Sequence, residues 1–538
     1  HGMLLQDEWM FWTTSGSKEQ IAKEFTRWLE DNWNHPSIII WDALNESSDP
    51  IVQNDIVPEM KKLDPARPWE SVDVVEEHPY IYSLGPVMND RKFGFARALH
   101  DIGKSAAPAM LNEFCWWWLD KDFRPTSLMK DVVERWLGPH WTTEQLIAHQ
   151  SFLVRELVEL FRRMRVDAIQ PFVYLSNNDG PTANWFAGDI KNLKPKPVLA
   201  TLKNAFSPFG ISIELWDRHF SSGENRSISV HVFNDSPALK RGAVRFGIVG
   251  PDEKWCVQES HALSVDPCDV AVIPVMLSFP NTTGEFRIRA ELFEQEHLVA
   301  FSEKVAHILE PVEKAARPRP ERIAVIDANA EIATFLKLRR LDVESFSPKN
   351  IKEYDVIVAN EGEVRSKVFQ NGFDAFKKFL EEGKTIALVE PERGIESNEN
   401  LLVAPGVVLQ IQKRKDDGRG GYDSYVFAED INHALWDGIT QERLKMFNGG
   451  YGGEVVSQHD VTTDSEHVVM ARCGLKLGVP AVFVIPVGRG KIIVSRLQLR
   501  GRLAETATEN DPFARRIDPV LQRYLLNLLG YALGEKRD

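Results

Sequence analysis

Two short apolar runs near the start of the sequence each end in a glutamate. Residues 38–41 are wholly apolar, as in a parallel strand buried on both faces, and Asn45 and Glu46 follow them. Residues 107–111 form a second run, and Glu113 follows it. Cleavage of a glycosidic bond with retention needs two carboxylates about 5–5.5 Å apart, one as acid/base and one as nucleophile. The two glutamates therefore predict this chemistry, and the alternative for the first is a strand end whose polar residues cap the next helix.

The elements that must position these carboxylates alternate between strand and helix. In a (β/α) barrel, catalytic groups project from the carboxyl ends of parallel strands, where the connecting loops form the substrate cavity. Apolar residues at helical spacing predict helices at 18–32, 51–63, 93–99, 143–164 and 199–206. Strands are predicted to end at residue 8 and to cover 38–41, 69–75, 107–111 and 166–175. This alternation predicts a parallel sheet with crossover helices for residues 1–206.

Other residues beyond the predicted strands are candidates for substrate contact. Asp7 and Glu8 could bind a hydroxyl group or a metal, and a structural ion pair is an equal alternative. His78 precedes a proline and is interpreted as a substrate contact, with a turn residue as the alternative. Tryptophan rings suit the apolar faces of sugars, and twelve of the fifteen lie at or before Trp185. The tryptophans beyond strand ends are the expected sugar contacts: Trp9, Trp12, Trp116, Trp117 and Trp185.

Two segments resemble the catalytic motifs of a known family. Residues 34–46 closely resemble the acid/base signature of glycoside hydrolase family 2, and residues 110–114 resemble the nucleophile strand of that family. The resemblance implies that Glu46 is the acid/base and Glu113 the nucleophile. It also implies that Asn45 contacts the 2-hydroxyl of the substrate.

The same resemblance implies an activity and two further contacts. It implies a tyrosine near the nucleophile, for which Tyr80 is the first choice, and an aromatic residue at the sugar site, which Tyr174 matches. The implied function is that of a retaining, exo-acting, β-galactosidase-like glycosidase. Such an enzyme removes terminal β-linked sugars from an oligosaccharide or glycoside, and no cofactor or metal is expected. Asp42-Ala43-Leu44 and Cys115 depart from the family pattern, and they keep open the alternative of a non-catalytic carbohydrate-binding protein with a family 2-like fold.

The first residues read as a strand that enters a core directly, and they resemble the third barrel strand of family 2 proteins. The resemblance implies a carboxy-terminal fragment whose barrel is partial, because the amino-terminal strands and the preceding sandwich domains would be missing. A leader peptide would then lie outside the fragment. A periplasmic or secreted location is slightly favoured, and the localisation is otherwise unknown.

Composition excludes several classes of partner. At 538 residues the chain exceeds what one core usually supports, so three domains are expected. The net charge of -14 and the lack of a basic run argue against nucleic acid and membrane surfaces as partners. The four cysteines lack metal-ligand spacing, although Cys256 and Cys268 could pair. Assembly into a homo-oligomer stays open.

Two further domains are predicted after the barrel portion, which makes the chain an α/β protein with one β domain. Residues 207–310 alternate apolar and polar side chains between turns, which predicts an immunoglobulin-like β-sandwich. Residues 311–322 mix proline with charge, as in a linker. Residues 323–538 alternate strands and helices and resemble the flavodoxin-like fold of class I glutamine-amidotransferase-like domains. Within this domain, residues 391–480 have no predicted structure.

Overall fold

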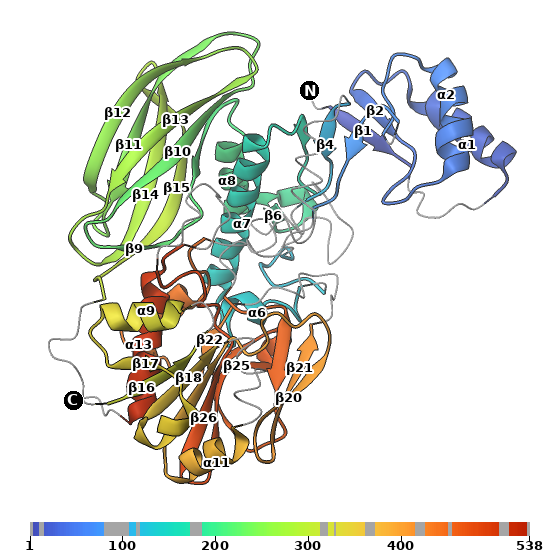
Figure 1. Cartoon of the computed structure of the whole chain (residues 1–538). Coiled ribbons are helices and arrows are strands. Elements are labelled where there is room, and N and C mark those ends of the chain that lie inside the picture. The colour runs from blue at the N-terminus through green and yellow to red at the C-terminus, as the bar shows by residue number, and fades with distance from the viewer. Residues whose placement is uncertain are drawn as a thin grey trace.

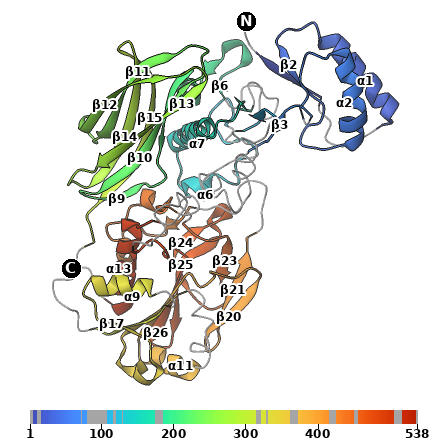
Figure 2. The ribbon, with the colours of Figure 1, turned by 45° about the horizontal axis from the view of Figure 1, so that its top comes forward.

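The computed structural model shows three parts that follow one another along the chain (Figure 1). A portion with parallel strands comes first, an antiparallel sandwich follows, and an α/β domain comes last. Figure 2 shows the same three parts from another side, with α1 (Lys18–Asn32) and α2 (Val57–Leu63) at one end of the molecule. The structure describes residues 4–9, 16–70, 72–79, 107–114, 119–127, 129–172, 185–312, 321–327, 330–360, 372–414, 425–449, 455–504 and 516–534.

The first two strands and α1 form a parallel βαβ unit. β1 (Leu5–Glu8) pairs in parallel with β2 (Ile38–Asp42), and α1 lies between them in the sequence. Ser17 caps α1 by accepting a hydrogen bond from the backbone N–H of Gln20. The prediction of this helix is confirmed, and its buried face consists of Ile21, Phe25, Trp28 and Leu29.

Three more parallel strands continue this portion. β4 (Ala109–Leu111) lies between β3 (Val75–Glu76) and β5 (Ala168–Ile169). Bridges from Trp41 to Trp69 and from Glu70 to Val74 connect β2 to this group. The strands therefore form part of a barrel, in an order that follows the sequence.

The predicted strand at 69–75 is wrong in its middle. The backbone N–H of Asp73 donates to the carbonyl of Trp69 at 2.8 Å, and the Asp73 carboxylate accepts from the backbone N–H of Trp69 at 2.9 Å. These two bonds close a turn, so the chain leaves the sheet between Trp69 and β3. The predicted strand at 166–175 is described as β5, and its last three residues lie outside the described residues, as does the predicted helix at 93–99.

The predicted helices at 51–63, 143–164 and 199–206 are confirmed, whereas a short helix at 134–137 was not predicted. Thr142 and Gln145 form a reciprocal capping box at the start of the longest helix. The helical segments after β2 are η1 (Val52–Ile56, a π-helix), α2, α6 (Glu134–Leu137), α7 (Thr143–Arg163) and α8 (Pro197–Ala205). Two short strands, β6 (Phe186–Ala187) and β7 (Lys194–Pro195), precede α8.

Two sheets pack face to face in the second part. The first contains, in order, β13 (Asp269–Ser278), β10 (Asn225–Asn234) and β8 (Phe209–Glu214). The second contains β12 (Trp255–Val265), β11 (Lys240–Val249), β14 (Gly284–Glu294), β15 (His297–Leu309) and β9 (His219–Ser221). Alternate residues such as Val230, Val232, Phe246 and Ile288 are buried between them.

Cys256 and Cys268 do not pair, so this suggestion from the sequence is wrong. Both thiols are free and exposed. Cys256 lies near the start of β12 and Cys268 lies beyond its end. Nine residues of extended chain span about 30 Å, far beyond the Cα separation that a disulfide bridges.

An eight-stranded sheet forms the centre of the third part. Its order is β17 (Val343–Ser345), β16 (Ile323–Ile326), β18 (Val356–Asn360), β19 (Thr385–Val389), β26 (Gly490–Ser495), β25 (Val479–Val487), β24 (Val468–Cys473) and β22 (Phe427–Ala428). The first five are parallel and the last three antiparallel. In chain order the parallel strands run 2-1-3-4-5, an order found in doubly wound sheets.

Both faces of this sheet are covered. Ile323 and Val325 belong to one apolar cluster, and the alternate residues Ala324 and Ile326 belong to another. α9 (Glu331–Leu338) and α13 (Pro519–Leu533) pack in the first cluster, and α11 (Phe373–Glu381) packs in the second. The unassigned stretch 391–480 adds a separate antiparallel sheet of β20 (Glu399–Ala404), β21 (Val407–Lys413) and β23 (His459–Thr462). Among the described residues, no helix combines the length and the apolar character needed to cross a membrane.

Candidate active site

Glu46 and Glu113 both lie beyond the carboxyl ends of parallel strands. Glu46 comes four residues after β2, and its backbone φ of 49° is in the left-handed region. Glu113 comes two residues after β4. The Glu46 side chain is 50% exposed, whereas that of Glu113 is 10% exposed. Asn45 is buried, and its side-chain oxygen has no hydrogen-bond partner among the described residues.

His78 lies between the two glutamates. Its Nδ1 is 3.1 Å from Glu46 Oε1 and 3.5 Å from Glu113 Oε2. One oxygen of each glutamate and one ring nitrogen all lie within 4.8 Å of one another. Carboxylates this close match the separation of about 5–5.5 Å used in retaining cleavage, whereas inverting cleavage needs about 6.5–9.5 Å.

A second group of carboxylates lies below this pair. Asp42, Glu70 and Glu76 each offer an oxygen within 4.8 Å of the others. The amide of Gln6 donates to Asp42 at 2.7 Å and to Glu76 at 3.4 Å, and the amide of Asn112 also donates to Glu76. His78 Nε2 is 3.9 Å from Glu76 Oε1, so the histidine connects the two groups.

The close approach of these carboxylates changes their protonation. Burial, with the charge of Glu70, raises the pKa of Asp42 to about 7. Burial and the charges of Asp42 and Glu70 also raise the pKa of Glu76. Burial, together with the charges of Asp42 and Glu113, raises the pKa of Glu8 to about 7. Glu8 therefore belongs to the electrostatic surroundings of the site.

Either group has the ligand atoms that a cation would need. Glu46, His78 and Glu113 would use the same atoms for a cation as for cleavage, so the two uses compete. Asp42, Glu70 and Glu76 form a buried acidic cluster, in which raised pKa values provide another way to reduce the charge.

The sequence did not single out Glu70, Glu76, Gln6 or Asn112. A usable signal was present, since charged residues are rarely buried in a strand. Glu70 is the second residue of the strand predicted at 69–75, and Glu76 follows its end.

Two of the predicted aromatic contacts are packing residues. Trp9 lies against Phe25 and Trp28 of α1, with ring centroids 5.6 and 5.7 Å apart. Trp185 is 3% exposed and belongs to the apolar cluster beneath β4 and α7. Asp7 accepts a hydrogen bond from the indole N–H of Trp28 at 3.1 Å, and burial raises its pKa. The other aromatic candidates lie outside the described residues: Trp12, Tyr80, Trp116, Trp117 and Tyr174.

Comparisons with known proteins give one family match and several distant structural similarities. Residues 10–105 match the model of the TIM barrel domain of glycosyl hydrolases family 2. A β-glycosidase from Bacteroides vulgatus is 13% identical, over 60% of this chain and 44% of that one, with a TM-score of 0.30. A Bacteroides uniformis β-glucuronidase 2 is also 13% identical, over 61% and 40%, with a TM-score of 0.28. No curated protein matches.

The family match covers the first part of the chain. Residues 10–105 are similar to the barrel domain of glycoside hydrolase family 2, as the motif around Glu46 predicted. The chain spans less than half the length of the two glycosidase structures named above. At TM-scores below 0.5, the similarity to those structures says nothing about the function of this chain.

Proposed function

We propose that this chain contributes the catalytic pair of a retaining, exo-acting β-glycosidase that removes terminal β-linked sugars. Glu113 is the nucleophile that attacks the anomeric carbon, and Glu46 is the acid/base that first protonates the leaving oxygen and then activates water. The observation that supports this assignment best is the distance: the oxygens of Glu46 and Glu113 approach within 4.8 Å, from the ends of two parallel strands.

The different exposure of the two side chains supports the division of roles. Glu113 is 10% exposed and is therefore held in place, as a nucleophile that forms a covalent bond must be. Glu46 is 50% exposed, so leaving groups and water can reach it. Asn45, which precedes Glu46, has a buried side-chain oxygen without a partner in the part of the chain that the structure describes, and this oxygen can accept a hydrogen bond from the 2-hydroxyl.

His78 affects how substrate enters. With Nδ1 within 3.5 Å of both glutamates, its ring occupies the space that the scissile bond needs. Substrate must therefore displace the ring, after which His78 can bind a sugar hydroxyl. A ring that keeps its place beside bound sugar would favour the alternative, a carbohydrate-binding protein without turnover.

Trapping with a 2-fluoro glycoside tests the nucleophile. In the full-length protein, a 2-fluoro β-glycoside should label Glu113 covalently, and Glu113→Ala should remove both the label and turnover of aryl β-glycosides. Labelling of another residue, or a labelled Glu113→Ala variant, would contradict the assignment.

Rescue by azide tests the acid/base. Glu46→Ala should slow cleavage most for poor leaving groups, because a good leaving group departs without protonation. Added azide should restore turnover of the glycosyl-enzyme and give the β-glycosyl azide, the product of two inversions. An α-azide would show that the reaction is not a double displacement through Glu113.

We also propose an immunoglobulin-like fold for the sandwich and a flavodoxin-like fold for the last domain. The sandwich has the size and the packed antiparallel sheets of an immunoglobulin-like domain. The 2-1-3-4-5 order of the parallel strands supports a flavodoxin-like name for the last domain.

A further inference from the structure

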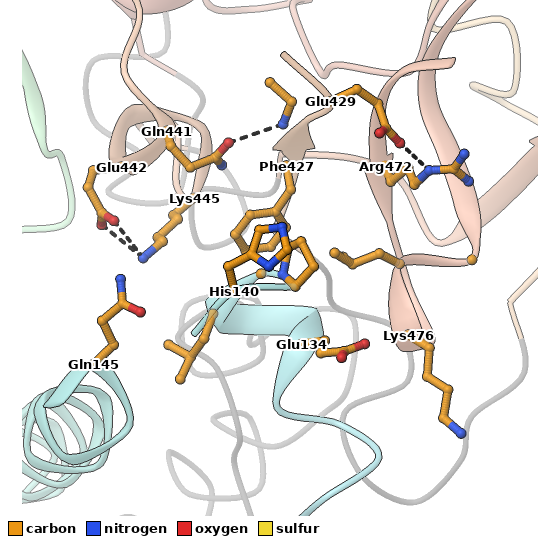
Figure 3. Close-up of a pocket in the computed structure, with 16 residues that line it drawn as sticks. Glu134, His140, Gln145, Phe427, Glu429, Gln441, Glu442, Lys445, Arg472 and Lys476 are labelled. Carbon is orange, nitrogen blue, oxygen red and sulfur yellow. Dashed lines mark hydrogen bonds and ion pairs between the residues drawn. The ribbon is translucent and has the colours of Figure 1, made fainter. Parts of the chain in front are cut away.

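A cavity of about 640 Å³ lies between the barrel portion and the α/β domain (Figure 3). Residues around α6 and the start of α7 form one side, and residues of β22, η6 (Gln441–Leu444) and η7 (Leu475–Leu477) form the other. Neither Glu46 nor Glu113 lines it. Its volume is in the range of small-molecule binding sites.

Most of the charges that line this cavity are arranged in ion pairs. The guanidinium of Arg472 pairs with Glu429, and Lys445 pairs with Glu442 at 2.9 Å, as Figure 3 shows. Lys476 pairs with Asp131 at 3.4 Å, just outside the cavity. A charged ligand would meet charges that are already neutralised, whereas a ligand with many hydroxyl groups would meet donors and acceptors side by side.

The cavity also offers a fixed apolar surface. Phe427 and Leu137 line it, together with Pro139 and the ring of His140. Gly138 has a φ of 85°, and a Cβ atom at this position would lie 2.8 Å from the Phe427 ring. The glycine therefore permits the close packing of Phe427 against the segment that follows α6.

A second cavity of about 430 Å³ adjoins the first. The two cavities share Leu137, Gln145, Glu442 and Lys445. The additional lining includes the apolar or aromatic residues Phe152, Tyr425 and Met446 together with charged and polar ones such as Glu285 and His307. The first cavity thus leads into one with an aromatic wall.

We propose that these two cavities form a second binding site, for a neutral glycoside. The sugar would lie in the larger cavity, with its hydroxyls on the ion pairs and its C–H face on Pro139, His140 and Phe427. The apolar substituent would lie in the smaller cavity, beside Phe152 and Tyr425. The proposal does not depend on the catalytic pair, because binding here requires no turnover.

Equilibrium binding of a non-hydrolysable glycoside tests the proposal. Phenyl 1-thio-β-glucoside and phenyl 1-thio-β-galactoside are neutral probes with an apolar substituent, and they should be titrated calorimetrically into the full-length protein that carries Glu113→Ala. We expect a binding event that Arg472→Gln and His140→Ala each weaken by about tenfold or more, the effect of losing a charge-assisted hydrogen bond or a packing surface. The matched control is Arg287→Gln, since Arg287 pairs with Glu253 on the sandwich, and it should leave binding unchanged.

Three results would overturn the proposal. In the first, neither Arg472→Gln nor His140→Ala changes binding of the probe at concentrations up to about 10 mM, although both variants unfold at the same temperature as the parent. The second is tighter binding of phenyl 1-thio-β-glucuronide at the same residues, which would assign an anion to the site. The third is equal affinity for the methyl thioglycosides, which would remove the role of the smaller cavity. Binding at this site is measured without turnover. A wrong assignment of the catalytic pair would therefore not change how these binding results are interpreted.

Discussion

Two parallel sheets in this chain place carboxylates at the ends of their strands, and they differ in what surrounds those carboxylates. In the α/β domain, Glu390 follows β19 directly and is fully buried. It accepts hydrogen bonds from the Arg393 guanidinium at 2.8 Å and from the Arg500 backbone N–H at 2.6 Å. In the barrel portion, the amides of Gln6 and Asn112 donate to Asp42 and Glu76, and the carboxyl group of Glu70 also lies against these two residues.

The difference shows that position at a strand end does not by itself identify a catalytic group. A carboxylate beside a guanidinium is stabilised as an anion and is a structural element. Burial and neighbouring carboxylates make such groups keep protons into the neutral range, as the raised pKa values of Asp42 and Glu8 illustrate. A group of that kind suits proton transfer, so the barrel portion is where we expect the chemistry.

The largest expected effect is the difference in activity between two variants, each with one strand-end glutamate neutralised in a different sheet. Glu113→Gln should lower kcat/KM for aryl β-glycosides by more than about a thousandfold, as expected for a lost nucleophile. Glu390→Gln removes a charge from an equivalent position in the other sheet, and kcat/KM should stay unchanged in folded protein. Steady-state kinetics of both variants, with circular dichroism to check folding, measures the contrast. A folded Glu390→Gln protein that loses turnover as Glu113→Gln does would break the comparison.

A smaller effect is expected where a buried carboxylate loses its cation. Lys304 of β15 pairs with Glu156 and Glu159 of α7, at 2.7 and 2.9 Å, and all three side chains are buried. The charges of Lys304 and Arg218 lower the pKa of Glu156 to about 2, although burial by itself would raise this pKa. Lys304→Met should destabilise the contact between α7 and the sandwich by about 3–5 kcal/mol, because it removes the nearest cation from two buried carboxylates.

Urea unfolding measures this loss, and Lys240→Met is the control. Lys240 also belongs to the sandwich and pairs with Glu294 at 2.8 Å, but both side chains are about 30% exposed. Its replacement should change stability by at most about 1 kcal/mol. Because the pKa of Glu156 is depressed, the contribution of the Lys304 pair is present above the ordinary pKa of 4.5 and is lost as the pH falls toward 2. Equal losses of stability in the two variants would show that burial does not determine how much these ion pairs contribute to the free energy of unfolding.

The sequence predicts those features that depend on neighbouring residues. The limits of α1 and the capped start of α7 follow from apolar spacing and capping residues, which are local signals. The proposed catalytic pair, Glu46 and Glu113, can be chosen from the sequence because each glutamate follows its own apolar run. The cluster of Asp42, Glu70 and Glu76 is not, since the turn at Asp73 and the pairing of β3 with β4 bring these residues together.

The least predictable region is 391–480, for the same reason. β20 and β21 form a hairpin, but β23 returns to pair with β21 from about fifty residues further along the chain. The turn at Gly406 is visible in the sequence, whereas the return of β23 depends on packing against β25. Neither apolar period nor turn residues specify such a contact.

The smallest expected effect comes from removing charge from the barrel cluster. Burial and the charges of Asp42 and Glu70 raise the pKa of Glu76, and that of Asp42 is about 7. Between the unfolded pKa, near 4, and these raised values, the folded chain binds more protons than the unfolded chain does. The stability that these carboxyl groups contribute is therefore fully present below about pH 4 and is lost as the pH rises through about 7 for Asp42 and about 10 for Glu76. Glu76→Gln replaces a carboxyl group that must keep its proton in the folded chain, and it should make the protein more stable than the parent at pH 8 by on the order of 2 kcal/mol, with little difference at pH 5. Denaturation followed by tryptophan fluorescence measures this change, because Trp41 and Trp69 belong to the core beside the cluster.

Asp460→Asn is the control, with an expected effect of opposite sign. Arg414 and Arg496 lower the pKa of Asp460, although burial by itself would raise it, so the replacement should destabilise the protein at pH 8. Parallel stability curves of the parent and Glu76→Gln between pH 5 and 8 would mean that the cluster is neutralised by other means, and the two sheets would then no longer differ.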